Sequence, residues 1–295
     1  MSSPWRIVDL TGFEGTVRAG QGVLTVGEIS VPLADISVIL SGLGGLYHPS
    51  VVDRAAAFEI PILHCDWRGV PIATTLGWND GSRVAARHRA QATLDLPRGK
   101  NAWMRIVKAK IRGQAANLES FDQDGFRRLI DLSTTVRSGD PSNVEGHAAR
   151  LYWPRLFENK SFRRMPQSRK ALNGMLDYGY TILRGASVRA VLTAGLWPTM
   201  GIWHHQRDNC FALADDLIEP FRPVIDALVQ KMAETTHALD KEAKHRLAGS
   251  MEQTLTGKGY TVSSEITRFA QQLARYIEGE VKILEVPVFA GLDED

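Results

Sequence analysis

Short apolar runs broken by glycine dominate the first 80 residues of the chain. These runs read "WRIVDL", "GTVRAG", "GVLTVG" and "ISVILSG", and they predict β-strands with a hairpin turn at "RAGQGV". One helix is predicted over "HPSVVDRAAAFEI", with Pro49 in its first turn. Two more strands are predicted in "PILHCDWRGVPIATTL", joined by a turn at Arg68 and Gly69. The first part of the chain therefore predicts a compact β-rich domain.

The pattern changes near residue 82, where apolar residues begin to recur every three or four positions. We therefore expect an α+β protein with a small N-terminal β-rich domain at 1–82, a basic linker at 83–100 and a larger all-α domain at 101–295. The linker is predicted because Pro97 and Gly99 interrupt a polar, basic stretch. The closing "VKILEVPVFAGLDED" predicts a short strand followed by an acidic end.

Composition narrows the class of protein. The chain has 295 residues, of which 44% are hydrophobic and 23% are charged, as in a globular protein of about two domains. No apolar window reaches the roughly 18 residues of a membrane span, and "MSSPWRIVDL" has no signal-peptide character, so we expect a cytoplasmic protein without a membrane partner. Cys65 and Cys210 are too far apart in sequence for a metal clip, and we interpret both as buried small hydrophobes.

Residues 195–223 gather acids and histidines in an otherwise apolar stretch. Asp215 and Asp216 both have helical spacing to Glu219, so spacing alone does not choose between the two pairs. Prolines at 220 and 223 place the acids near a helix start or break, where carboxylates commonly cap backbone N–H groups. The alternative is a divalent cation such as Mg²⁺ or Mn²⁺, with Zn²⁺ as a weaker candidate, because carboxylates with a histidine and no cysteine suit that kind of ion.

A third carboxylate is offered by "GDPSNVEGHAARLYWPRLF". Ser142 and Glu145 have the spacing of a capping box, in which the glutamate would bond back to the Ser142 backbone. Capping and metal binding are compatible for Glu145, since a carboxylate has two oxygens.

A one-sided run of basic residues follows, with Glu158 as its single acid. A phosphate backbone suits such a run when aromatic residues are interleaved with it, and the alternative is an ordinary solvated surface. The candidate DNA-binding residues are Arg150, Arg155, Lys160, Arg163, Arg164, Arg169 and Lys170, among Tyr152, Trp153, Phe157 and Phe162. Basic residues of the linker and of "MRIVKAKIR", which includes Lys110, support the same interpretation.

Three segments together resemble a known family. "GDPSNVEGHAARLYWPRLF", "ALNGMLDYGYTILRGASVRAVLTAGLWPTMGIWH" and "FALADDLIEPFRPVID" are similar to successive motifs of the CRISPR-associated integrase family, the Cas one protein, in its type II branch. The resemblance implies a β-domain used for dimerisation or assembly, followed by a helical catalytic domain. It also implies a metal-dependent DNA endonuclease and integrase of CRISPR adaptation, an antiviral defence.

Carried over one residue at a time, the family's metal ligands and catalytic residues are Glu145, His204 and Glu219. Asp216 matches the acidic neighbour in the last motif, as a ligand or as a residue that supports one, and His205 and Asp215 are flanking residues. The resemblance further implies Mg²⁺ or Mn²⁺ as cofactor and a homodimer that works with the Cas two protein, the Cas nine effector and type II accessory proteins on double-stranded DNA, namely the spacer fragment and the CRISPR repeat.

The mechanism to be expected is transesterification, in which a DNA 3′-hydroxyl attacks a phosphodiester at the leader-repeat end of the array. Two other functions remain open from the residues. The same site could cleave branched or single-stranded DNA, or the protein could be a non-catalytic DNA-binding scaffold in which the acids and histidines only cap helices.

Overall fold

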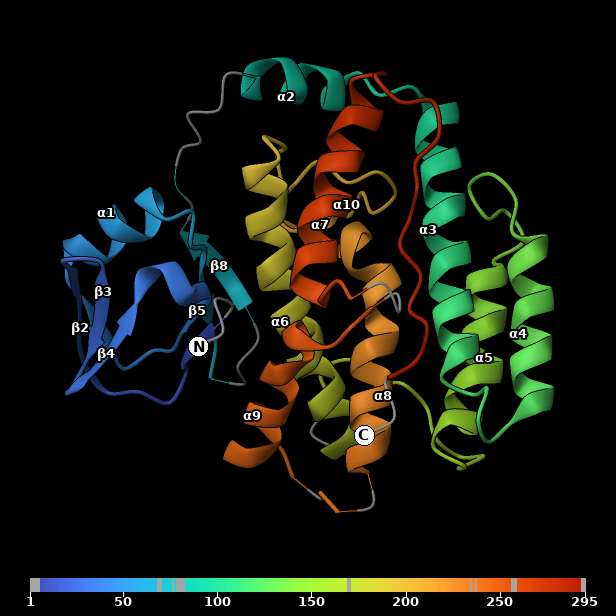
Figure 1. Cartoon of the computed structure of the whole chain (residues 1–295), viewed down its shortest axis with the longest axis horizontal. Helices are drawn as coiled ribbons and strands as arrows, with labels where there is room; N and C mark the ends of the chain where they lie inside the picture. The colour runs from blue at the N-terminus through green and yellow to red at the C-terminus, as the bar shows by residue number, and fades with distance from the viewer. Residues whose placement is uncertain are drawn as a thin grey trace.

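A computed structural model of the protein describes residues 6–67, 71–75, 77, 83–168, 171–233, 235–236, 238–255 and 259–292. A β-rich N-terminal region lies at one side, and a bundle of helices forms the rest (Figure 1). The predicted α+β class, with strands first and helices after, is confirmed. The turn predicted at Arg68 and Gly69 lies outside the described residues.

One sheet of the β-region faces the helical bundle. Its four strands lie in the order β1 (Arg6–Leu10), β5 (Ile36–Ser41), β7 (Ile62–Cys65) and β8 (Pro71–Thr75). β1, β5 and β7 are parallel, and β8 is antiparallel to β7. All six residues of β5 are buried, because one face packs on β-domain side chains and the other, through Val38 and Leu40, on the helices.

The second sheet has the order β4 (Ile29–Pro32), β3 (Val23–Val26), β2 (Gly15–Gly20) and β6 (Gly45–Tyr47). The predicted hairpin joins β2 to β3, and Gln21 and Gly22 in its turn both have positive φ, as a two-residue hairpin requires. The predicted helix is α1 (Pro49–Ala57), with Pro49 in its first turn. β4 and β6 were not predicted, because they are short and their side chains alternate too little to mark a strand.

The segment predicted as a basic linker is helical in the structure. It contains α2 (Val84–Ala92) and the first residues of α3 (Leu96–Ala116), and α2 lies across the end of the helical bundle, next to α10 (Figure 1). Asp95 caps α3 by accepting a hydrogen bond from the backbone N–H of Arg98, at 2.7 Å. Pro97 therefore lies in the first turn of a helix, where a missing N–H costs nothing, and does not mark a break.

The helical region is built around two long helices, α3 and α6 (Ala171–Thr193). Besides α2, the other elements are α4 (Gln123–Thr135), α5 (Val144–Leu156), α7 (Ala212–Ile218), the 3-10 helix η2 (Glu219–Phe221), α8 (Arg222–Met232), α9 (Lys241–Ala248), the 3-10 helix η3 (Gly249–Glu252) and α10 (Val262–Ile277). α3 packs against α4, α5 and η2, while α6 packs against α7, α8 and α10. The short strand predicted near the end of the chain is absent from residues 281–292. This segment packs on the helical core through the buried side chains of Leu284 and Phe289.

Two glycines let α6 approach its neighbours closely. A Cβ at Gly185 would lie 2.8 Å from a methyl of Val38 on β5, and a Cβ at Gly179 would lie 2.4 Å from a methyl of Ile225 on α8. α6 therefore fixes both the β-region and the helix that follows η2. No helix in the described part of the chain has the length and apolar character that crossing a bilayer requires.

Candidate metal centre

Glu145 lies in the first turn of α5, and its carboxylate is not used for capping. The side chain of Asn143 caps the helix, accepting from the N–H of Gly146 at 3.1 Å, and Asp140 accepts from the N–H groups of Val144 and Glu145 at 2.9 and 3.0 Å. The capping box expected between Ser142 and Glu145 does not form, because the N-cap is Asn143, one residue later, and Asp140 already accepts from the N–H of Glu145 that Ser142 would have bonded. The Glu145 carboxylate is left free for another partner.

That partner is Lys110, which reaches the site from α3. Its ammonium lies 2.5 Å from an oxygen of Glu145 and 2.6 Å from an oxygen of Glu219. The side chains of Lys110 and Glu219 are 14% and 5% exposed, so the contact is shielded from solvent. Burial lowers the pKa of Lys110, but the charges of Glu219 and Glu145 more than offset it, so the pKa is raised.

Glu219 stands where α7 passes into η2, with Pro220 next to it in the first turn of that short helix. Its second cationic neighbour is Arg222, with Nε 3.0 Å from Oε1. Burial raises the pKa of Glu219, but the charges of Arg222 and Lys110 outweigh burial and hold the pKa below its ordinary value. Glu219 is therefore ionised at neutral pH despite its depth.

His204 is held in one orientation by Asp216. Its Nδ1 lies 2.6 Å from Asp216 Oδ1, which also accepts from the His204 backbone N–H at 3.3 Å. The hydrogen bond that its imidazole donates to Asp216 is the main reason why the pKa of His204 is raised, and the charge of Glu219 raises it further. With Nδ1 bonded to a carboxylate, Nε2 is the nitrogen left for a metal ion in the neutral ring.

Asp216 is fully buried and has both oxygens engaged. Oδ2 accepts from the backbone N–H groups of Ile202 and Trp203 at 2.6 and 3.0 Å, while Oδ1 serves His204. Of the two roles expected for Asp216, this geometry favours support of His204 over direct ligation. The imidazole of His204 also meets the edge of the buried Trp103 ring, with ring centroids 5.4 Å apart.

The flanking residues point elsewhere. His205 is exposed. Asp215 accepts from Arg184 at 2.7 Å and from Asn209 at 2.9 Å, so its carboxylate is engaged outside the site. The structure thus brings Glu145 and Glu219 together through Lys110, with His204 beside Glu219.

The donors present fit a divalent cation such as Mg²⁺ or Mn²⁺. Two carboxylates and one imidazole are suitable ligands, and Oε2 of Glu219 is a buried oxygen without a well-directed hydrogen bond. Within the described residues no three acidic, histidine or cysteine side chains converge on one point. Lys110 keeps the carboxylates of Glu145 and Glu219 apart, because its ammonium lies between them.

The predicted DNA-binding residues divide into three groups. Arg150, Lys160 and Arg163 are exposed, and the guanidinium of Arg163 also donates to the backbone oxygens of Lys160 and Phe162 at 2.9 and 2.8 Å. Arg155 pairs with Asp122 and Asp124 at 2.7 and 2.8 Å, and Arg164 pairs with Asp177 at 2.5 Å. Arg169 and Lys170 lie outside the described residues.

The aromatic residues interleaved with these bases pack on one another. Trp153 stacks with Phe157 at a centroid separation of 6.2 Å, and Phe157 meets Phe162 at 4.5 Å. Tyr152 is completely buried and contacts Trp153. Their spacing therefore reflects a core under α5 and not a platform on which bases stack.

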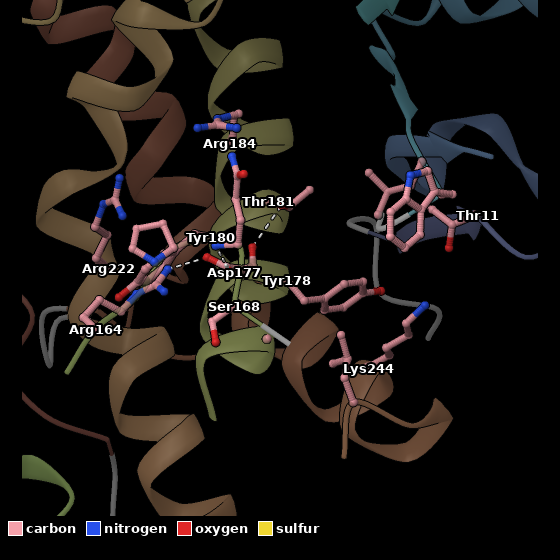
Figure 2. A pocket seen from close by; sticks show the side chains of 16 residues that line it. Thr11, Arg164, Ser168, Asp177, Tyr178, Tyr180, Thr181, Arg184, Arg222 and Lys244 are labelled. Atoms are coloured by element: carbon pink, nitrogen blue, oxygen red, sulfur yellow. Dashed lines mark hydrogen bonds and ion pairs between the residues drawn. The ribbon is translucent and has the colours of Figure 1, made fainter. Parts of the chain in front are cut away.

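A cavity of about 500 Å³ opens beside α6, between the bundle and the β-region. Figure 2 shows Arg164, Arg184 and Arg222 near α6, with Lys244 across from them. Each of these cations has a carboxylate partner, respectively Asp177, Asp215, Glu219 and Asp9. The cavity meets the metal centre at Arg222, and its lining is close to neutral.

Sequence reasoning missed two parts of the site. Lys110 was grouped with the phosphate-binding bases, although it follows Trp103 and Val107 on the apolar face of α3, where a cation indicates a buried partner. The other part is Asp226 on α8, which is buried and accepts from the hydroxyls of Tyr152, at 3.1 Å, and Tyr180. Burial raises the pKa of Asp226 to about 6.

Fold and site together define a class: an α+β protein whose helical part holds two carboxylates on one lysine ammonium, with a carboxylate-supported histidine nearby. Comparisons with known proteins give the family. The model of the CRISPR associated protein Cas1 family matches residues 20–259. A CRISPR-associated endonuclease Cas1 of Neisseria meningitidis serogroup C is 35% identical over 202 residues, which are 68% of this chain and 66% of that protein. The chain therefore belongs to the Cas1 family.

Solved structures share the fold. A casposase bound to integration product has a TM-score of 0.74 at 21% identity, covering 96% of this chain and 92% of that one. A chain of a Cas6-RT-Cas1–Cas2 complex has a TM-score of 0.77 at 18% identity, covering 96% of this chain and 36% of that one. The arrangement of β-region and helical bundle is thus that of Cas1 proteins and of a casposase.

Proposed function

We propose that this Cas1 protein is a divalent-metal-dependent DNA integrase that inserts short DNA fragments at the leader-repeat end of a CRISPR array. The observation that carries the proposal is the pair of carboxylates, Glu145 and Glu219, which meet at one cation next to His204. The name of the Neisseria relative, an endonuclease, and the casposase seen with its integration product support chemistry on DNA phosphodiesters.

Glu145, His204 and Glu219 would hold the ion. Mg²⁺ or Mn²⁺, when bound, supplies a Lewis acid for an attacking 3′-hydroxyl and for the charge that develops on phosphate and leaving oxygen. Asp216 keeps the imidazole oriented, and Arg222 holds Glu219 in place at 3.0 Å. In the reaction, the 3′-oxygen forms a bond to phosphorus, and the bond from phosphorus to the displaced strand's 3′-oxygen breaks.

Arg150, Lys160 and Arg163 are the best candidates for backbone contacts, because they are exposed on or just after α5. Such contacts supply affinity that falls as salt rises, without choosing a sequence. Arg155 and Arg164 have structural partners, and we assign them to the fold.

The proposed partners follow from relatives. A fold neighbour was solved in a complex that contains Cas1 and Cas2, so we propose that this chain, as a homodimer, also assembles with Cas2 on double-stranded DNA. The type II motifs extend the proposal to the Cas nine effector and its accessory proteins.

Hydrolysis is the second candidate reaction, since the curated relative is named an endonuclease and water could replace the 3′-hydroxyl. The scaffold alternative requires the acids to serve as caps. Glu145 and Glu219 instead contact Lys110, and a different residue, Asn143, caps α5. The geometry therefore favours an enzyme.

Strand transfer of a short duplex into a supercoiled plasmid with leader and repeat tests the proposal, with Cas2 present and with Mg²⁺, Mn²⁺ or EDTA. We expect metal-dependent joining that is lost in Glu145→Gln and His204→Ala. His205→Ala is the matched control, because this neighbouring histidine is exposed, and it should keep wild-type activity. Joined strands and released fragments differ in length, which separates integration from hydrolysis. Joining that survives Glu145→Gln would refute the catalytic assignment.

A further inference from the structure

Lys110 lies where the proposed metal centre needs a cation. Its ammonium is 2.5 Å from a carboxylate oxygen of Glu145 and 2.6 Å from one of Glu219. These two glutamates lie in α5 and η2, which are far apart in the sequence. The inference that follows rests on the proposed function, because it takes these carboxylates as metal ligands.

The Lys110 ammonium and a divalent ion bound by Glu145 and Glu219 would occupy almost the same position. Carboxylate oxygens lie about 2.0–2.1 Å from a bound Mg²⁺, so each oxygen would need to move inward by only about 0.5 Å relative to its present distance from nitrogen. Two cations cannot occupy that space together. Binding of the ion therefore requires the ammonium to leave at least one of the carboxylates.

We propose that Lys110 is a resident counter-ion that keeps Glu145 and Glu219 together before metal binding and is displaced when a divalent ion enters. Lys110 is a positioning residue in this role. It stabilises the metal-free site, and by the same amount it opposes metal binding, because its contacts must be given up first.

Lys110 is the cation that yields, and Arg222 is the one that stays. Of the two carboxylates, Arg222 contacts that of Glu219. Its guanidinium also stacks on the Tyr180 ring, 4.5 Å from the ring centre. Lys110 has a flexible four-carbon stem and a compact charge, so it can swing aside from α3.

Displacement changes the charge of the site. Glu145 and Glu219 balance Lys110 and Arg222 in the metal-free protein, so the four charges sum to zero. A divalent ion raises the sum to +2 without removing either lysine or arginine, and a phosphodiester then meets a positive site. Metal binding and DNA binding should consequently strengthen each other.

Affinity for Mn²⁺ in the absence of DNA provides the test, measured from the electron paramagnetic resonance signal of the free ion. Lys110→Met should bind Mn²⁺ at least about tenfold more tightly than the wild type, because two charge-assisted contacts no longer compete. Lys108→Met is the matched control: it removes the same charge from α3, and two residues apart on a helix lie about 200° apart around the axis. It should bind Mn²⁺ like the wild type.

Thermal unfolding covers the case in which the variant folds poorly. In EDTA, Lys110→Met and the milder Lys110→Gln should melt below the wild type, since two carboxylates lose their counter-ion. Saturating Mn²⁺ should raise their melting temperatures by more than it raises that of the wild type. A variant that remains unfolded with saturating Mn²⁺ would overturn the proposal, because the ion would then be unable to replace the ammonium.

The design also separates this inference from the proposed function. Glu219→Gln and His204→Ala should lose Mn²⁺ binding if the metal centre is correctly assigned. If they do so while Lys110→Met binds Mn²⁺ no more tightly than Lys108→Met, only the role of Lys110 is refuted. If all variants bind Mn²⁺ equally, the metal centre itself is wrong.

Discussion

Replacing Asp216 by asparagine tests how the histidine of the site is held. Asp216 accepts four hydrogen bonds, from Nδ1 of His204 and from the backbone N–H groups of Ile202, Trp203 and His204, at 2.6 to 3.3 Å. An asparagine has only one acceptor oxygen. Whichever way the amide turns, its NH₂ group faces either the two N–H groups or the histidine.

The loss can be estimated from these contacts. If the amide oxygen serves Ile202 and Trp203, its NH₂ donates to Nδ1 of His204 and moves the ring proton to Nε2, which can then no longer ligate a metal. If it turns the other way, two buried N–H groups lose their acceptor at about 1–3 kcal/mol each. We expect Mn²⁺ affinity to fall by about 10–100-fold, as for other residues that support a metal ligand.

The assay is Mn²⁺ binding across pH, with thermal unfolding alongside. A metal ion competes with a proton for the imidazole, so in the wild type affinity rises with pH through the pKa of His204, which lies above 6.5. Asp216 is the main cause of that raised pKa, so Asp216→Asn should move the midpoint to lower pH. In a double variant with His204→Ala, the loss should be no greater than for His204→Ala alone. Additive losses would refute the reasoning and make Asp216 a direct ligand.

Three further results are expected. The pKa of Asp226 is about 6 when folded against 3.8 normally, so protonation stabilises the native state, and about 3 kcal/mol of unfolding free energy is lost as pH rises through this window. Asparagine does not titrate, so the stability of Asp226→Asn relative to the wild type should improve between pH 4 and pH 8. Urea titrations measure the two free energies of unfolding, and a difference between them that does not change with pH would contradict this. Arg155→Met should lower the melting temperature because Asp122 and Asp124 lose their partner, with little effect on the salt dependence of DNA binding, whereas Arg150→Met should do the reverse. Asn143→Ala should destabilise the protein by about 1 kcal/mol through the lost cap of α5 and weaken Mn²⁺ binding through Glu145, which calorimetry can check.

Much of the fold could be predicted from local pattern. The hairpin at Gln21 and Gly22, the helix beginning at Pro49 and the change to helical spacing near residue 82 all have signals within a few residues. The helix α2 could not be recognised, because it has few large apolar residues. It is held in place instead by arginines whose partners lie far along the chain. Arg83 and Arg87, for example, both bond Glu278.

The site was predicted less evenly. Motif resemblance gave the ligand candidates Glu145, His204 and Glu219, which the structure brings into one neighbourhood, although their role as ligands stays a prediction. Local rules misjudged Glu145, for which a capping box was expected, because the helix is capped by Asn143 and the N–H of Glu145 bonds Asp140. Lys110 was misplaced for a different reason: sequence shows its charge, but only the packing of α3 against α5 and η2 shows that the charge is buried.

The way the site is divided along the chain also governs when activity can arise. Lys110, Glu145 and Glu219 come from α3, α5 and the start of η2, and they meet only because these elements pack together, while hydrogen bonds to Asp216 hold His204 beside the last of them. A chain that is still being synthesised, or one cut before residue 219, has no assembled centre. The proposed metal centre therefore forms only after the helical region has folded as a whole.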